Sequence, residues 1–114
     1  MTLQTANNYA NSLCLLQRFE EARSLLRRTM PVARCVLGEE HRVTLKMRLN
    51  YAAALCEADG ATLDDLREAA NTLEDVAPVA RRVFGGAHPL MKTVEEDLRK
   101  ARAGLAATEQ SINT

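Results

Sequence analysis

The chain has 114 residues, of which 46% are hydrophobic and 26% are charged, so its size and composition fit one globular domain. Fifteen basic residues balance fifteen acidic ones, which excludes the strong positive field typical of proteins that bind nucleic acid or anionic membranes. No segment has the length of a membrane span, no secretory signal opens the chain, and the three cysteines form no CxxC pair. We therefore expect a soluble, cytoplasmic protein without a disulfide framework or a metal site.

Apolar residues recur at helical spacing along the whole chain. In the first segment Ala6, Ala10 and Leu13 follow one another at three- and four-residue steps, and Ala22 and Leu26 begin a similar series in the second. This pattern predicts an all-α fold without strands. In chain order, the expected helices cover residues 3–16, 19–37, 44–58, 63–84 and 90–107.

The sequence also repeats itself. Asn8-Tyr9-Ala10 recurs 42 residues later as Asn50-Tyr51-Ala52, and Pro31-Val32-Ala33-Arg34 recurs 47 residues later as Pro78-Val79-Ala80-Arg81. An insertion of five residues in the second unit accounts for the longer shift. A period of this length is typical of helical-repeat proteins, in which each unit is one helix hairpin. We expect a single domain over residues 1–114, with repeat 1 at about 2–43, repeat 2 at about 44–90, a capping helix at about 91–107 and a tail at 108–114.

Local signals mark the ends of the predicted helices. Gly38 and Gly85 are of the residue type that closes a helix in a left-handed turn, and Pro89 suits the first turn of the next helix. Thr62 and Asp65 have the spacing of a capping box, in which each side chain accepts a hydrogen bond from the other residue's backbone. The five-residue insertion is therefore expected to end where a new helix starts.

Small and large apolar residues are expected at the helix contacts. Ala22 and its equivalent Ala69 permit two helices to approach closely, while Tyr9, Leu13 and Leu26 fill the space between helices. The last helix carries one apolar stripe on an otherwise charged surface, as the terminal helix of a repeat stack requires. That stripe consists of Val94, Leu98, Ala101 and Leu105, and the charged residues around it are Lys92, Glu95, Glu96, Asp97, Arg99, Lys100 and Arg102.

An ordered set of short motifs runs through both units. They are Thr2-Leu3, Asn8-Tyr9-Ala10, Glu21-Ala22, Leu37-Gly38 and His41 in the first unit, and Thr44-Leu45, Asn50-Tyr51-Ala52, Glu68-Ala69, Phe84-Gly85 and His88-Pro89 in the second. This order resembles the kinesin light chain class of tetratricopeptide repeat. The resemblance implies a right-handed α-solenoid of antiparallel helix hairpins that binds other proteins. Because the first unit lacks a preceding turn, we expect the end of a longer array, whose exposed N-terminal repeat face is available for self-association.

The same resemblance places the first helix of each hairpin on the concave face of the solenoid. The residues expected there are Gln4, Asn7, Asn8, Asn11, Lys46, Asn50 and Ala53. An asparagine amide both donates and accepts hydrogen bonds, so a row of asparagines can hold the backbone of an extended peptide. In the alternative interpretation, Asn8 and Asn50 bond neighbouring helices and fix their packing. Lys46 and Arg48 either pair with an acidic peptide or lie on a solvated helix face.

No arrangement of residues predicts catalysis or a cofactor. His41 and His88 occupy equivalent places between a helix-ending glycine and the next helix, which favours a turn-capping role over a catalytic or metal-binding one. No glycine-rich phosphate loop and no nucleophile with a matching base are present. The predicted function is a protein-interaction module that binds a partner's peptide in its groove. The alternative is a structural cap or spacer without a ligand, which a groove filled by residues 106–114 would favour.

Overall fold

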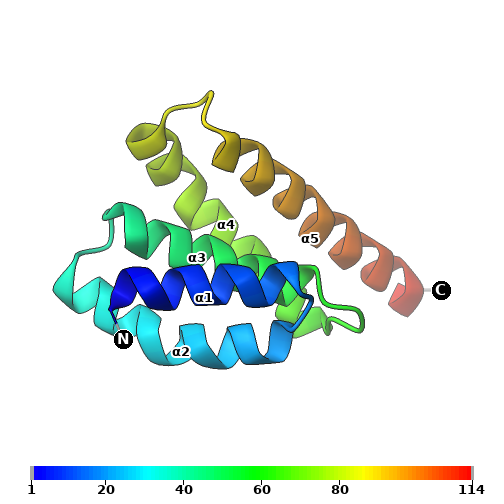
Figure 1. Cartoon of the computed structure of the whole chain (residues 1–114). Coiled ribbons are helices and arrows are strands. Elements are labelled where there is room, and N and C mark those ends of the chain that lie inside the picture. The colour runs from blue at the N-terminus through cyan, green and yellow to red at the C-terminus, as the bar shows by residue number, and fades with distance from the viewer. Residues whose placement is uncertain (1, 114) are drawn as a thin grey trace.

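The structure is a computed structural model that describes the backbone of residues 2–113 and the side chains of residues 2–108. This described part contains five α-helices and no strand, which confirms the predicted all-α helical-repeat fold (Figure 1). Four helices begin and end within two residues of their predicted bounds, whereas the last continues six residues further. The helices are α1 (Leu3–Leu15), α2 (Phe19–Val36), α3 (Arg42–Cys56), α4 (Leu63–Phe84) and α5 (Pro89–Asn113).

Helix α3 is the centre of the fold. Helices α1 and α2 form one antiparallel hairpin, α3 and α4 form a second, and α5 packs against the second hairpin (Figure 1). Helix α3 contacts each of the other four helices, and ten of its fifteen residues are buried. Because neighbours pack on several sides of α3, its buried residues are spread around the helix, and it is the least amphipathic of the five helices.

The helix ends form as the sequence predicted. The Thr62 hydroxyl accepts a hydrogen bond from the backbone N–H of Asp65, and the Asp65 carboxylate accepts one from the N–H of Thr62, both at 3.1 Å. Gly38 and Gly85 have φ angles of 96° and 92°, a left-handed conformation in which a side chain would be strained. Pro89 is the first residue of α5. Capping interactions of this kind are each worth about 1 kcal/mol and fix where a hairpin turns.

Alanines lie where the helices approach most closely. Ala22 of α2 and its equivalent Ala69 of α4 are both 0% exposed, in one continuous apolar core with Leu26 and Leu73. Protein interiors are closely packed and hold few voids, so even a small increase in side-chain volume at such a position is destabilising. The equivalence of the two positions indicates that both hairpins close in the same way.

We predict that Ala22→Leu and Ala69→Leu each destabilise the protein by roughly 1–3 kcal/mol, because the added methylenes force the helices apart. Urea denaturation of each variant beside the wild type measures the change. Ala103→Leu, at an exposed position on α5, is the matched control and is expected to leave the midpoint almost unchanged. Midpoints that are unchanged in both buried variants would show that these alanines tolerate wider helix spacing.

Tyr9 departs from its predicted place between helices. It is 46% exposed, whereas its repeat equivalent Tyr51 is 6% exposed. The Tyr51 hydroxyl accepts a hydrogen bond from Nε of Arg27 at 3.1 Å and donates one to the Glu68 carboxylate at 2.8 Å. Helix α2 of the first hairpin supplies Arg27 and covers Tyr51, but no helix in the described residues stands in that position relative to Tyr9. The prediction for Tyr9 was therefore wrong, because burial there depends on a preceding helix.

Candidate functional site

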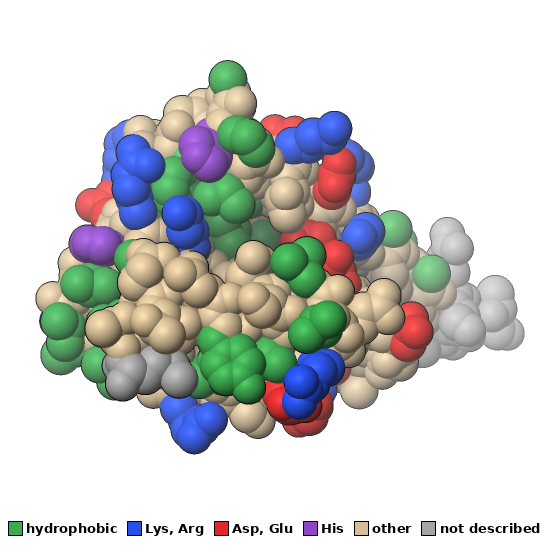
Figure 2. Space-filling model, viewed as in Figure 1, with side chains coloured by type: hydrophobic (Ala, Val, Ile, Leu, Met, Phe, Trp, Pro, Cys, Tyr) green, Lys and Arg blue, Asp and Glu red, His purple; other side chains and the backbone are tan. Residues whose placement is uncertain are grey.

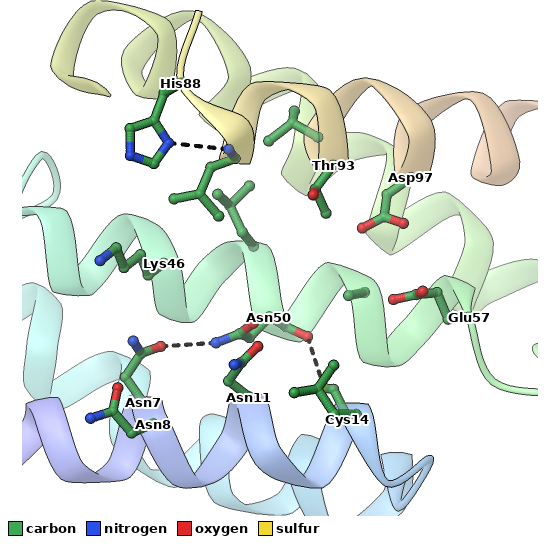
Figure 3. Close-up of a pocket in the computed structure, with 15 residues that line it drawn as sticks. Asn7, Asn8, Asn11, Cys14, Lys46, Asn50, Glu57, His88, Thr93 and Asp97 are labelled. Atoms are coloured by element: carbon green, nitrogen blue, oxygen red, sulfur yellow. Dashed lines mark hydrogen bonds between the residues drawn. The ribbon is translucent and has the colours of Figure 1, made fainter. Parts of the chain in front are cut away.

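A groove of about 500 Å³ lies between α1, α3 and α5. Figure 2 shows the hollow in the molecular surface, and Figure 3 shows the side chains that surround it. Each of the three helices contributes one wall, so the fold itself sets the width of the groove. The lining residues are Asn7, Asn8, Asn11, Cys14 and Leu15 from α1, Lys46, Leu49, Asn50, Ala53 and Glu57 from α3 and its cap, and His88, Leu90, Thr93, Val94 and Asp97 from α5 and the turn before it.

Six of the seven residues predicted for the concave face line this groove, and Gln4 is the exception. Gln4 lies one turn before Asn8 on α1, and its amide nitrogen donates a hydrogen bond to the Asn8 side-chain oxygen at 3.0 Å. Gln4 therefore orients a groove residue without lining the groove. Ala53 is 8% exposed and contributes to the floor.

Among the described residues, Asn7 and Asn50 form the one hydrogen bond between two side chains that joins α1 to α3 (Figure 3). The Asn50 amide nitrogen donates to the Asn7 side-chain oxygen at 2.9 Å, and Asn7 is only 4% exposed. A buried amide without its partner would cost about 1–3 kcal/mol, so this bridge holds the two helices in register. For Asn50 the structure therefore shows the helix-bonding role that the sequence left as an alternative.

The remaining polar groups on the α1 side are open to solvent. Asn8 and Asn11 are exposed, and Asn11 has no hydrogen-bond partner among the described residues. Lys46 is half-buried at one end of the groove, where its ammonium lies 5.9 Å from the centre of the Phe84 ring. Arg48 does not share this end with Lys46, because it lies on the opposite side of α3, in a hollow near Tyr51. The sequence left open whether Arg48 pairs with an acidic peptide or lies on a solvated helix face, and its place outside the groove lining does not favour pairing with a peptide in this groove.

Cys14 lines the groove and Cys56 lines a neighbouring hollow, and each is a small apolar residue whose thiol donates a hydrogen bond. The Cys14 thiol donates to the backbone oxygen of Asn50 at 3.8 Å, and the Cys56 thiol donates to the backbone oxygen of Asp97 at 4.0 Å. Burial, together with the charges of Glu57 and Asp97, raises the pKa of Cys14 to about 11 and that of Cys56 to about 12. Both thiols are therefore neutral and unreactive near pH 7.

Asp97 and Glu57 make the end of the groove opposite Lys46 acidic (Figure 3). Asp97 is 3% exposed, so its predicted place among the solvated charges of the last helix was wrong. It lies three residues after Val94 and four before Ala101, and this helical spacing puts it on their buried face. The burial of its carboxylate, followed by the negative charge of Glu57, raises the pKa of Asp97 to about 7.

The two histidines cap helices, as their equivalent positions predicted. Nδ1 of His41 accepts a hydrogen bond from the backbone N–H of Val43, and Nδ1 of His88 accepts one from that of Leu90, both at 3.1 Å. Within the described residues, no group of three or more His, Cys, Asp or Glu side chains is placed to hold a metal ion. None of the helices in this part of the chain is long and apolar enough to cross a membrane.

Comparison with known families agrees with this architecture. The family model described as tetratricopeptide repeat matches residues 1–62, which is more than half of the chain and covers the first hairpin with all of α3. No curated protein and no solved structure matches the chain. Tetratricopeptide repeats form a non-enzymatic family whose members generally act in protein interaction. Two repeated hairpins, a fifth helix packed against the second of them and this match together show that the chain belongs to the tetratricopeptide repeat family.

Proposed function

We propose that the groove between α1, α3 and α5 binds an extended peptide segment of a partner protein, and that the chain serves in a kinesin-light-chain-like adaptor or scaffold in the cytoplasm. One observation carries the proposal: the exposed amides of Asn8 and Asn11 stand on the rim of a groove whose floor is apolar. No cofactor, nucleic acid or membrane has a part in this function.

The chemistry of the rim suits a peptide backbone. Asn8 and Asn11 are three residues apart on α1, so their side chains stand next to each other on one face of the helix. Each amide can donate to a peptide carbonyl and accept from a peptide N–H, whatever the peptide's side chains are. Leu49, Ala53 and Val94 supply apolar surface below them, which favours burial of alternate peptide side chains.

The double variant Asn8→Ala/Asn11→Ala is expected to weaken peptide binding by roughly five-fold to more than a hundred-fold. Each hydrogen bond lost to the peptide costs about 0.5–1.5 kcal/mol, and about 1.4 kcal/mol corresponds to a factor of ten in affinity. Peptides are first selected from a displayed library of short random sequences with the wild-type protein. Fluorescence anisotropy then gives the Kd of each selected peptide for the wild type and for the variant.

Asn50→Ala is the matched comparison because it removes an amide that bonds within the fold. It is expected to lower the free energy of unfolding by about 1–3 kcal/mol, since Asn7 then keeps a buried amide without a partner. The free energy of unfolding of the variant Asn8→Ala/Asn11→Ala should stay within about 0.5 kcal/mol of the wild-type value. A double variant that melts early yet binds the selected peptides unchanged would overturn the proposed role of the rim.

A second candidate function, a structural cap that stacks on another copy or another repeat, is favoured by the exposure of Tyr9 on the N-terminal repeat face. Of residues 106–114, which would fill the groove in this alternative, the described side chains 106–108 do not line it, and the side chains of 109–114 lie outside the described residues. Sedimentation equilibrium tests self-association through this face. A monomer at every concentration would leave the stacking candidate without support.

A further inference from the structure

Asp97 has an unusual environment for a carboxylate. Its side chain is 3% exposed and is directed at the groove, and no described residue donates a hydrogen bond to it (Figure 3). The thiol of Cys56 bonds the backbone oxygen of Asp97 and leaves the carboxylate free. Buried charges in proteins are normally paired, because an isolated one loses the hydration it had in water. Asp97 lines the groove, so a partner bound there can reach its carboxylate.

The groups around Asp97 make this end of the groove attractive to a cation. Glu57 lines the same end, so two carboxylates face the groove. Lys100 lies 3.7 Å from the Glu57 carboxylate, but it lines a neighbouring hollow and not the groove. The titratable groups close to Asp97 are Cys14 from α1, Cys56 and Glu57 from α3 and its cap, and Glu96 and Lys100 from α5.

We propose that the acidic end of the groove, formed by Asp97 and Glu57, binds the cationic side chain of a lysine or arginine in the peptide. This inference rests on the function proposed above and names the residue class that the groove selects. A long basic side chain fits because its methylene stem can lie along Ala53 and Val94 while its charged head reaches Asp97. A metal ion fits less well, since Ca²⁺ takes six to eight oxygen ligands and this end offers two carboxylates.

The opposite end of the groove carries the opposite charge. Lys46 lies there, eleven positions before Glu57, which corresponds to about 16 Å along α3 and its cap. An extended peptide covers that distance in about five residues at roughly 3.3 Å each. The preferred peptide therefore carries a basic residue at Asp97 and an acidic residue or a terminal carboxylate about five positions away at Lys46. Such a charge pattern also fixes the direction in which the peptide lies.

Asp97→Asn tests this anchor because it keeps the shape of the side chain and removes its charge. Peptides selected from the random library with the wild type should share a lysine or arginine at one position. Asp97→Asn should bind those peptides about ten- to a hundred-fold more weakly, the range expected for one charge-assisted hydrogen bond. Glu57→Gln should weaken binding in the same direction by a smaller factor, because Glu57 is exposed.

The control is Glu96→Gln, which removes the same charge from the adjacent residue of α5 without touching the groove lining. Its affinity for the selected peptides should stay close to that of the wild type. Wild-type affinity should also rise between pH 6 and pH 8 as Asp97 loses its proton, by up to about ten-fold per pH unit below its pKa, and Asp97→Asn should lack this rise.

The outcomes separate the anchor from the proposed function. Peptides that bind, depend on Asn8 and Asn11, and share no basic residue would overturn the anchor alone. Equal losses in Asp97→Asn and Glu96→Gln would also overturn it, because the effect would then be one of long-range charge. If no peptide is selected by the wild type, the groove function fails and this inference fails with it.

Discussion

Asp97→Asn is expected to raise the free energy of unfolding at pH 8 by about 2–4 kcal/mol. The pKa of Asp97 is about 7 in the folded protein against an ordinary 3.8, and three pKa units correspond to about 4 kcal/mol. A carboxyl whose folded pKa is raised favours folding when it is protonated. That favourable contribution is complete below about pH 4 and is lost as the pH rises through about 7. The lower end of the range allows for the cost of burying the asparagine amide in its place.

The measurement is guanidinium denaturation of the wild type and the variant at a series of pH values from 4 to 8. The difference between them should be small at pH 4, grow steadily to pH 7 and remain constant above it. Glu96→Gln is the control for a general change in net charge, and its difference from the wild type should be much smaller at every pH. A stability difference for Asp97→Asn that does not change with pH would show that the Asp97 carboxyl has an ordinary pKa.

Leu26→Ala and Leu73→Ala are each expected to destabilise the protein by about 2–5 kcal/mol. Both leucines are 0% exposed and occupy equivalent positions in α2 and α4, so each truncation removes buried apolar surface and leaves a cavity. Chemical denaturation followed by circular dichroism measures the loss. For a domain of this size such a loss is a large share of the total stability.

Leu16→Ala provides the matched comparison for these variants. Leu16 follows α1 and is 66% exposed, so the same chemical change there should cost less than about 0.5 kcal/mol. Similar losses for Leu26 and Leu73 would agree with one hairpin geometry in both units. A loss at Leu26 as small as that at Leu16 would mean that the first hairpin is loosely packed.

The parts of the fold that depend on neighbouring residues were predictable from the sequence. The capping box at Thr62 and Asp65 and the left-handed turns at Gly38 and Gly85 involve residues close together in the chain, so their patterns carry the full signal. The extension of α5 beyond residue 107 was not predicted, because the apolar stripe used to predict this helix ends at Leu105, although no glycine or proline after it stops the helix.

The sequence could not predict the burial of a side chain where that burial depends on a helix distant in the chain. Tyr9 and Tyr51 occupy the same place in the repeated motif, yet one is exposed and the other is buried beneath α2. The repeat identifies equivalent positions within a unit, and it does not state whether a unit has a neighbour on each side. For this reason the sequence predicted a burial of Tyr9 that the structure does not show.

The groove was predicted in outline and not in its bonding. The sequence repeat makes Asn8 the equivalent of Asn50. The hydrogen bond between α1 and α3, however, joins Asn50 to Asn7, the residue before Asn8. A shift of one residue along the helix axis between α1 and α3 decides which asparagine bonds Asn50. The residue pattern within one helix does not predict this shift. The burial of Asp97 was missed for a different reason. A charged residue in a charged segment is expected to face solvent, and only its spacing from Val94 shows that it lies on the buried face of α5.

The central position of α3 has a consequence for the rate at which a peptide leaves the groove. Lys46, Asn50 and Ala53 belong to a helix that is enclosed by the other four, and segments buried in this way are the last to open during local unfolding. These residues lose their conformational entropy when the protein folds, so peptide binding carries no further entropic cost of ordering them. Association then needs no prior rearrangement of this wall. Differences in affinity among peptides that meet α3 should therefore appear in their dissociation rates, with association rates nearly alike.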